Sequence, residues 1–103
     1  MQAVTNEGMQ TLILTGELDL ASGAELDETI RRLCRTGTAG LVIDLRKLSF
    51  IDSTGVKSML QAGRLCEEHG HEFRLIPGPR NIQRIFEVTG LDRALPFVGS
   101  PAS

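Results

Sequence analysis

The sequence predicts an α/β fold with a mixed central sheet of four to five strands, packed by α-helices and with crossover helices joining parallel core strands. Short runs of apolar β-formers alternate with segments in which apolar residues recur every three or four positions. The run LVIDL at residues 41–45 is almost entirely apolar, as expected of a central strand covered on both faces. A chain of 103 residues suffices for one domain, so we expect a single domain over residues 1–103.

The first elements predicted are a hairpin and a helix. An edge strand at the start of the chain, a turn at residues 6–8 and a strand at residues 10–15 form the hairpin, whose antiparallel pairing makes the sheet mixed. The helix is expected to open at Ser22, because Ser22 and Glu25 have the spacing of a capping box. Its apolar face is formed by Leu26, Ile30, Leu33 and Cys34.

The second half of the chain continues the alternation. A loop at residues 48–51 is expected to follow the central strand, and a helix begins at the DSTG tetrapeptide, residues 52–55. The apolar stripe of this helix is Val56, Met59, Leu60, Gly63 and Cys66. Leu65 lies off the stripe, so either the helix is buried more deeply than the stripe indicates or Leu65 faces a partner.

The last elements are a third apolar strand at residues 73–76, a helix after the Gly78-Pro79 pair and a short strand at residues 95–98. The inward face of the helix is Ile82, Ile85, Phe86 and Thr89. Gly90 is suited to a left-handed stop. The tail, residues 99–103, is expected to be flexible.

Composition excludes several classes of function. A net charge of −2 argues against nucleic-acid and anionic-membrane partners, which need a basic surface. No apolar segment is long enough for a membrane span, and the start of the chain has no secretory signal. Cys34 and Cys66 fall on apolar helix faces, which suggests two buried thiols in a reducing compartment. We therefore expect a cytoplasmic protein.

Three kinds of chemistry lack the residues they need. His69 and His71 have no third ligand nearby, so no metal site is expected there, and they lie at the far end of the helix from Ser53. Asp19, Asp44 and Asp52 could hold Mg²⁺ as in a phosphate-receiver domain, but no lysine follows a late strand. No glycine pattern matches a phosphate loop. The sequence predicts no cofactor and no enzymatic activity.

The DSTG tetrapeptide has a plain interpretation and a functional one. Asp, Ser and Thr are all preferred helix caps, worth about 0.5–2 kcal/mol each. One cap suffices, however, and three stand in a row. Gly55 in the first turn costs about 0.5–1 kcal/mol relative to Ala, which suggests close approach by another backbone. The preceding residues, 48–51, also offer apolar side chains on which a partner can sit.

At these residues the sequence resembles the STAS domain family, and within it the small bacterial anti-sigma factor antagonists. The resemblance runs from about Thr11 to Val98. It is carried by four motifs together, GELDL at residues 16–20, VIDL at 42–45, FIDSTG at 50–55 and RIFEVTGLD at 84–92.

The resemblance implies a phosphorylation switch. In that family the serine of the D-S-[ST]-G motif, here Ser53, is phosphorylated by a partner that is both a serine kinase and an anti-sigma factor. The unmodified protein binds this partner and frees the sigma factor, phosphorylation breaks the complex, and a serine phosphatase reverses the modification. The expected partner-binding residues are Asp19, Ser49, Phe50, Asp52, Ser53, Thr54, Gly55 and Lys57.

The sequence departs from the family pattern at two points. Many relatives have a second glycine where Lys57 stands, and Lys57 could alter which kinase docks. Many also continue into a fourth helix, for which the tail is too short. The alternative function is a non-switching STAS scaffold or adaptor in a stress-sensing or transport complex, with Ser53 only a helix cap.

Overall fold

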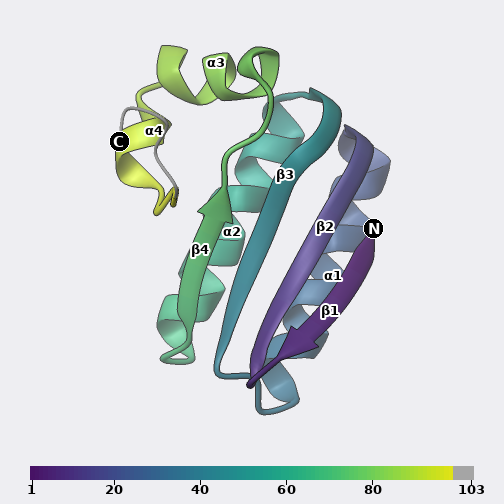
Figure 1. Ribbon diagram of the computed structural model, residues 1–103, viewed down its shortest axis with the longest axis vertical. Helices are drawn as coiled ribbons and strands as arrows, with labels where there is room; N and C mark the ends of the chain where they lie inside the picture. The colour runs from purple at the N-terminus through teal and green to yellow at the C-terminus, as the bar shows by residue number, and fades with distance from the viewer. Residues whose placement is uncertain (99–103) are drawn as a thin grey trace.

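The computed structural model describes residues 1–98, which form a four-stranded sheet in the order β1-β2-β3-β4, with four helices (Figure 1). The elements are β1 (Gln2–Asn6), β2 (Met9–Leu18), α1 (Leu20–Arg35), β3 (Gly40–Ile51), α2 (Ser53–Glu68), β4 (Glu72–Ile76), α3 (Arg80–Val88) and α4 (Leu91–Ala94). The α/β fold with a mixed sheet is confirmed. The tail predicted at residues 99–103 lies outside the described residues.

Strands β2, β3 and β4 are parallel, and β1 is antiparallel to β2. The crossovers β2-α1-β3 and β3-α2-β4 join strands that are neighbours in both sequence and space. Crossovers of one hand between consecutive strands put their helices on the same side of the sheet. Both α1 and α2 lie behind the sheet in Figure 1. The two crossover helices therefore cover one face of the central strand, but residues 41–45 are buried or half-buried on both faces, as predicted.

The predicted hairpin is confirmed by its turn. Glu7 has φ 54° and Gly8 has φ 84°, so both central residues adopt the left-handed conformation that matches the twist of a two-residue hairpin. The ladder between β1 and β2 runs from Asn6 opposite Met9 to Gln2 opposite Ile13. Beyond Ile13, β2 continues to Leu18 in contact with β3 alone.

Helix α1 begins earlier than its predicted start at Ser22. The N-cap is Asp19, whose carboxylate accepts a hydrogen bond from the Ser22 N–H at 3.2 Å, while the Ser22 hydroxyl accepts one from the Asp19 N–H at 2.9 Å. The capping box therefore pairs Asp19 with Ser22, and the predicted pairing of Ser22 with Glu25 is wrong. An aspartate is as good a cap as a serine, and nothing in the local spacing separates the two registers.

The loop predicted at residues 48–51 is absent, because β3 runs without a break to Ile51. Residues 48, 50 and 51 remain paired with β2, with register shifts between Ile13 and Thr15 and between Gly16 and Glu17. These irregularities interrupt the alternation of side chains. The strand therefore ends directly before the DSTG tetrapeptide, and only Asp52 separates β3 from α2.

The core lies between the sheet and the two helices behind it. The fully buried side chains of β3 include Leu41, Ile43, Leu45 and Ile51. Leu65 is half-buried and packs against this core, so the helix is buried more deeply than its stripe indicates. Cys34 and Cys66 are both buried and unpaired by a disulfide, as the sequence predicts.

The last described residues lie along the outer edge of β4. Helix α3 begins directly after Pro79 and buries Ile82 and Phe86. Gly90 (φ 75°) then turns the chain into α4, a helix of four residues that the sequence did not predict and that precedes the tail. The final strand expected at residues 95–98 is reduced to a single bridge, in which Phe97 lies opposite Leu75. The described sheet therefore has four strands.

Candidate functional site

Strands β2 and β3 end side by side. Leu18 and Ile51 are the last paired residues of the two strands, and the Asp52 N–H donates to the Leu18 carbonyl at 3.3 Å. The next residue after each pair, Asp19 and Asp52, is the N-cap of a helix. Helices α1 and α2 therefore start next to each other at one end of the sheet, as Figure 1 shows.

Asp19 is held in place by its own helix start. Besides exchanging hydrogen bonds with Asp19, the Ser22 hydroxyl donates to the Glu17 carbonyl at 3.0 Å. Hydrogen bonds from the backbone and side chain of Ser22 lower the pKa of the Asp19 carboxyl below its usual value. Asp19 is thus a fixed negative charge at this end of the molecule.

Asp52, and not Ser53, caps α2. Its Oδ1 accepts the Gly55 N–H at 3.0 Å, and its backbone carbonyl accepts the Val56 N–H at 3.0 Å. Ser53 is the first residue of the helix, it is exposed, and its hydroxyl takes part in no hydrogen bond with another side chain or backbone group of residues 1–98. The interpretation of Ser53 as a mere cap therefore does not fit the geometry.

Two glycines bring the helix starts close to the strands and to each other. A Cβ on Gly55 would stand 2.7 Å from Ile51 Cγ1, and a Cβ on Gly23 would stand 3.1 Å from the Ser58 hydroxyl oxygen. Gly55 is buried, so its contribution to the site is close packing and not surface contact. Thr54 is half-buried, with its methyl group facing Gly23.

The other predicted partner-binding residues surround the two helix starts. Ser49 and Phe50 are exposed near the end of β3. The Ser49 carbonyl accepts a hydrogen bond from the Asn81 side chain of α3 at 3.1 Å. Lys57 is exposed one helical turn after Ser53. The expected set thus gathers at one end of the molecule.

Sequence reasoning missed Leu20. It is the first residue of α1, and its side chain is 74% exposed. The predicted apolar face of Leu26 and Ile30, continued back by one turn, reaches residues 22 and 23, so Leu20 lies beside that face and not on it. Leu20 was missed because the helix was expected to begin at Ser22, two residues after it.

The alternative chemical sites are not assembled. Asp44 lies in the middle of β3, away from the strand ends, and pairs with Arg46 through hydrogen bonds of 2.8–3.2 Å that lower the pKa of the Asp44 carboxyl. His69 is the C-cap of α2, so it lies at the opposite end of the helix from Ser53. Within residues 1–98, no three His, Cys, Asp or Glu side chains are grouped as a metal site. None of the helices in this part of the chain is long and apolar enough to cross a membrane.

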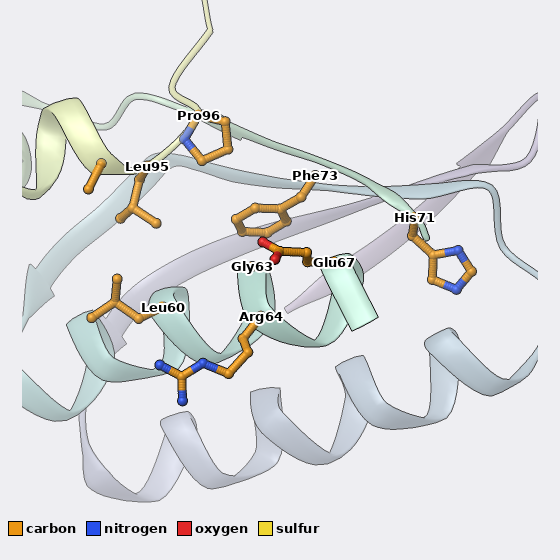
Figure 2. Close-up of a pocket in the computed structure, with 9 residues that line it drawn as sticks. Leu60, Gly63, Arg64, Glu67, His71, Phe73, Leu95 and Pro96 are labelled. Atoms are coloured by element: carbon orange, nitrogen blue, oxygen red, sulfur yellow. The ribbon is translucent and has the colours of Figure 1, made fainter. Parts of the chain in front are cut away.

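A groove of about 480 Å³ lies elsewhere, between the second half of α2 and β4. Figure 2 shows the Phe73 ring over Gly63, with Leu60 and Leu95 to one side and His71 to the other. A Cβ on Gly63 would stand 3.2 Å from this ring, so the glycine allows Phe73 to lie against α2. The groove shares no residue with the predicted site.

The protein is a small α/β domain. At the end of the sheet where α1 and α2 start, it presents an exposed serine, Ser53, beside two capped helix starts. A family model described as STAS domain matches residues 1–102. The chain belongs to the STAS domain family.

Three proteins are similar to this chain, one compared by sequence and two by solved structure. The chain is 26% identical over 91 residues to the anti-sigma-B factor antagonist of Staphylococcus aureus (strain NCTC 8325 / PS 47), which covers 88% of this chain and 84% of that protein. The fold of this chain matches the solved structure of the anti-sigma factor antagonist SpoIIAA in its unphosphorylated form, with a TM-score of 0.81 and 22% identity. The match covers 96% of this chain and 88% of the SpoIIAA chain. The fold also matches an anti-sigma factor antagonist from Mycobacterium paratuberculosis, with a TM-score of 0.82, 22% identity and coverage of 98% and 86%.

Proposed function

We propose that this protein is an anti-sigma factor antagonist controlled by phosphorylation of Ser53. In its unmodified form it binds an anti-sigma factor that is also a serine kinase, and thereby frees a sigma factor for transcription. Phosphorylation by the same partner releases the complex, and a serine phosphatase restores the binding form. The protein acts in the cytoplasm and catalyses no reaction itself.

The observation that carries the proposal is the position of the Ser53 hydroxyl. It is exposed at the first residue of α2, it caps nothing, and Asp52 already satisfies the Gly55 N–H. A kinase can therefore reach the hydroxyl without unfolding the helix. The relatives that carry the name anti-sigma factor antagonist support the choice of partner.

The physical effect of the phosphoryl group favours a switch at an interface. It adds a charge of about −1.5 to −2 at neutral pH. The start of α2 stabilises this charge by about 0.3–1 kcal/mol through its free N–H groups and dipole, while Asp52 and Asp19 oppose it. These opposed effects leave the fold nearly unchanged. A partner that covers Ser53 must instead desolvate a dianion, at a cost of several kcal/mol, and each 1.4 kcal/mol lowers affinity tenfold.

The direct test is phosphate mapping with a matched control. The protein is incubated with ATP and the cognate anti-sigma factor kinase, and the modified residue is located by mass spectrometry. Ser53→Ala is expected to bind the kinase and take up no phosphate, while Thr54→Val, altered at the neighbouring hydroxyl, is still modified. Uptake by Ser53→Ala at the wild-type rate contradicts the assignment of the site. A stable complex in which the wild-type protein is never phosphorylated favours the non-switching scaffold.

A further inference from the structure

Two exposed apolar side chains stand at the same end of the molecule as Ser53. Leu20 is 74% exposed and Phe50 is 48% exposed. Large apolar side chains left in water contribute little to the stability of the fold, because the hydrophobic effect rewards only buried area. Single exposed apolar side chains are common on protein surfaces, so the informative observation is that two of them occur at the end of the molecule that presents Ser53.

Both residues lie close in the fold to Ser53, the proposed phosphorylation site. Leu20 follows the cap Asp19 as Ser53 follows the cap Asp52, so Leu20 and Ser53 occupy equivalent positions in two adjacent helices. Phe50 comes three residues before Ser53 and pairs with Glu17 across the two strands. Leu20 and Phe50 thus flank the two helix starts, one from α1 and the other from β3.

A stable interface is wide enough for a partner that covers Ser53 to reach both residues. Such an interface buries about 800 Å² on each partner, which corresponds to a disc of about 16 Å radius. Neighbouring strands are about 4.8 Å apart, and Leu20 and Phe50 each lie within two residues of the last strand pair, Leu18 with Ile51. Interfaces are apolar at the centre and polar at the rim, and a few large side chains supply most of the affinity.

We infer that Leu20 and Phe50 are the apolar anchors that hold the anti-sigma factor kinase over Ser53, an inference that rests on the function proposed above. The partner surface that fits them has two apolar recesses, next to the groups that meet the Asp19 carboxylate and the Ser53 hydroxyl. Affinity and switching are then divided between different side chains. Leu20 and Phe50 supply contact area in every complex, and Ser53 decides through its phosphate whether that contact forms.

The test compares these anchors with a side chain of the same kind elsewhere. Val88, at the end of α3, is 76% exposed and lies outside the site, so Val88→Ala is the matched control. Leu20→Ala and Phe50→Thr are each expected to weaken binding of the unmodified protein to the kinase about 10- to 50-fold by calorimetry, as the loss of one buried apolar side chain predicts. Phosphorylation kinetics should show KM raised and kcat unchanged, because the anchors act before the chemical step. Circular dichroism melts should match the wild type.

Each outcome bears on a separate claim. If the wild-type protein binds the kinase and is phosphorylated on Ser53, but both variants bind as the wild type does or no more weakly than Val88→Ala, the anchors are refuted and the proposed function stands. If the wild-type protein forms no complex with the kinase, the proposed function fails and the anchors fail with it. If sedimentation shows that Leu20→Ala abolishes self-association and leaves kinase binding unchanged, the surface binds a second copy of the chain and the inference is overturned.

Discussion

Gly55 lies so close to Leu18 that a Cβ atom on Gly55 would stand 2.8 Å from the Leu18 carbonyl oxygen. The same atom would stand 2.7 Å from Ile51 Cγ1. Real Cβ atoms do not approach backbone oxygen this closely, and the oxygen belongs to a strand that cannot move freely. The absence of a side chain at residue 55 is therefore what lets α2 start against the ends of β2 and β3 and hold Ser53 at the surface.

We predict that Gly55→Ala lowers the free energy of unfolding by about 1–3 kcal/mol, since overpacking outweighs the gain in helix propensity. Urea denaturation followed by circular dichroism measures the change. Gly63→Ala, in the same helix, is the control: its Cβ would meet the Phe73 ring at 3.2 Å, and a half-buried side chain can yield where a strand carbonyl cannot. A Gly55→Ala protein as stable as Gly63→Ala would show that the start of α2 is free to move.

The order of the elements was predictable because each carries a local signal. The hairpin follows from its Glu7-Gly8 turn, whose backbone conformation few residues adopt. Helix α2 follows from the apolar stripe that contains Val56 and Met59, both buried in the structure. The position of Ser53 beside the end of a strand followed from the same reasoning, because a buried strand and a helix start adjoin in the sequence.

What the sequence did not predict depends on contacts between distant residues. Asp19 and Ser22 are equally good caps, and only the end of β2 at Leu18 decides that Asp19 takes the role. Residues 48–51 have no strand alternation, because pairing with β2 passes through two register shifts. Leu20 was missed for a different reason, because the helix was expected to begin at Ser22, which left Leu20 outside the helical periodicity.

The structure assigns Asp19 two separable properties, a cap and a negative charge. Asp19→Ala removes both and should lower the free energy of unfolding by about 1 kcal/mol, because the Ser22 N–H loses its acceptor. Asp19→Asn keeps a capping oxygen and removes the charge, so its stability should stay close to that of the wild type. Thermal melts of the two variants measure the difference. Equal losses in both would mean that the charge and not the cap stabilises α1.

The contribution of the Asp19 charge to kinase binding can be measured separately from its contribution to stability. If the carboxylate takes part in binding the kinase, Asp19→Asn should weaken the complex although the fold is intact. Calorimetric titration with the unmodified protein measures this effect, with Ser22→Ala as the control that disturbs the capping box and keeps the charge. Binding of Asp19→Asn at wild-type strength would limit Asp19 to a structural role.

Ser53→Asp is predicted to weaken kinase binding and to leave stability nearly unchanged. An aspartate at the first helical position interacts favourably with the helix dipole by about 0.3–1 kcal/mol, and repulsion from Asp52 offsets part of this gain. At the interface the same charge must be desolvated, which is costly. Pull-down and circular dichroism on one preparation test both halves of the prediction. A large loss of stability in Ser53→Asp would indicate that the serine supports the fold.

The buried thiols predict how stability depends on alkaline pH. Burial, together with the neighbouring Cys34 thiol, raises the pKa of Cys66 to about 12, from 9.0 in an unstructured chain. Between these two values the folded protein keeps a proton that the unfolded chain releases, so the free energy of unfolding must fall as pH rises. From pH 7 to pH 10 the loss attributable to Cys66 is about 1.4 kcal/mol.

Urea midpoints at pH 7, 9 and 10 for the wild type and for Cys66→Ala test this prediction. The variant begins less stable because it lacks a buried side chain, so the comparison concerns the slope with pH and not the absolute value. The wild-type curve should fall more steeply above pH 9, because only the wild type has the Cys66 thiol to titrate on unfolding. Parallel curves would mean that Cys66 ionises as easily in the folded protein as in the unfolded chain, which requires α1 and α2 to separate where Cys34 and Cys66 meet.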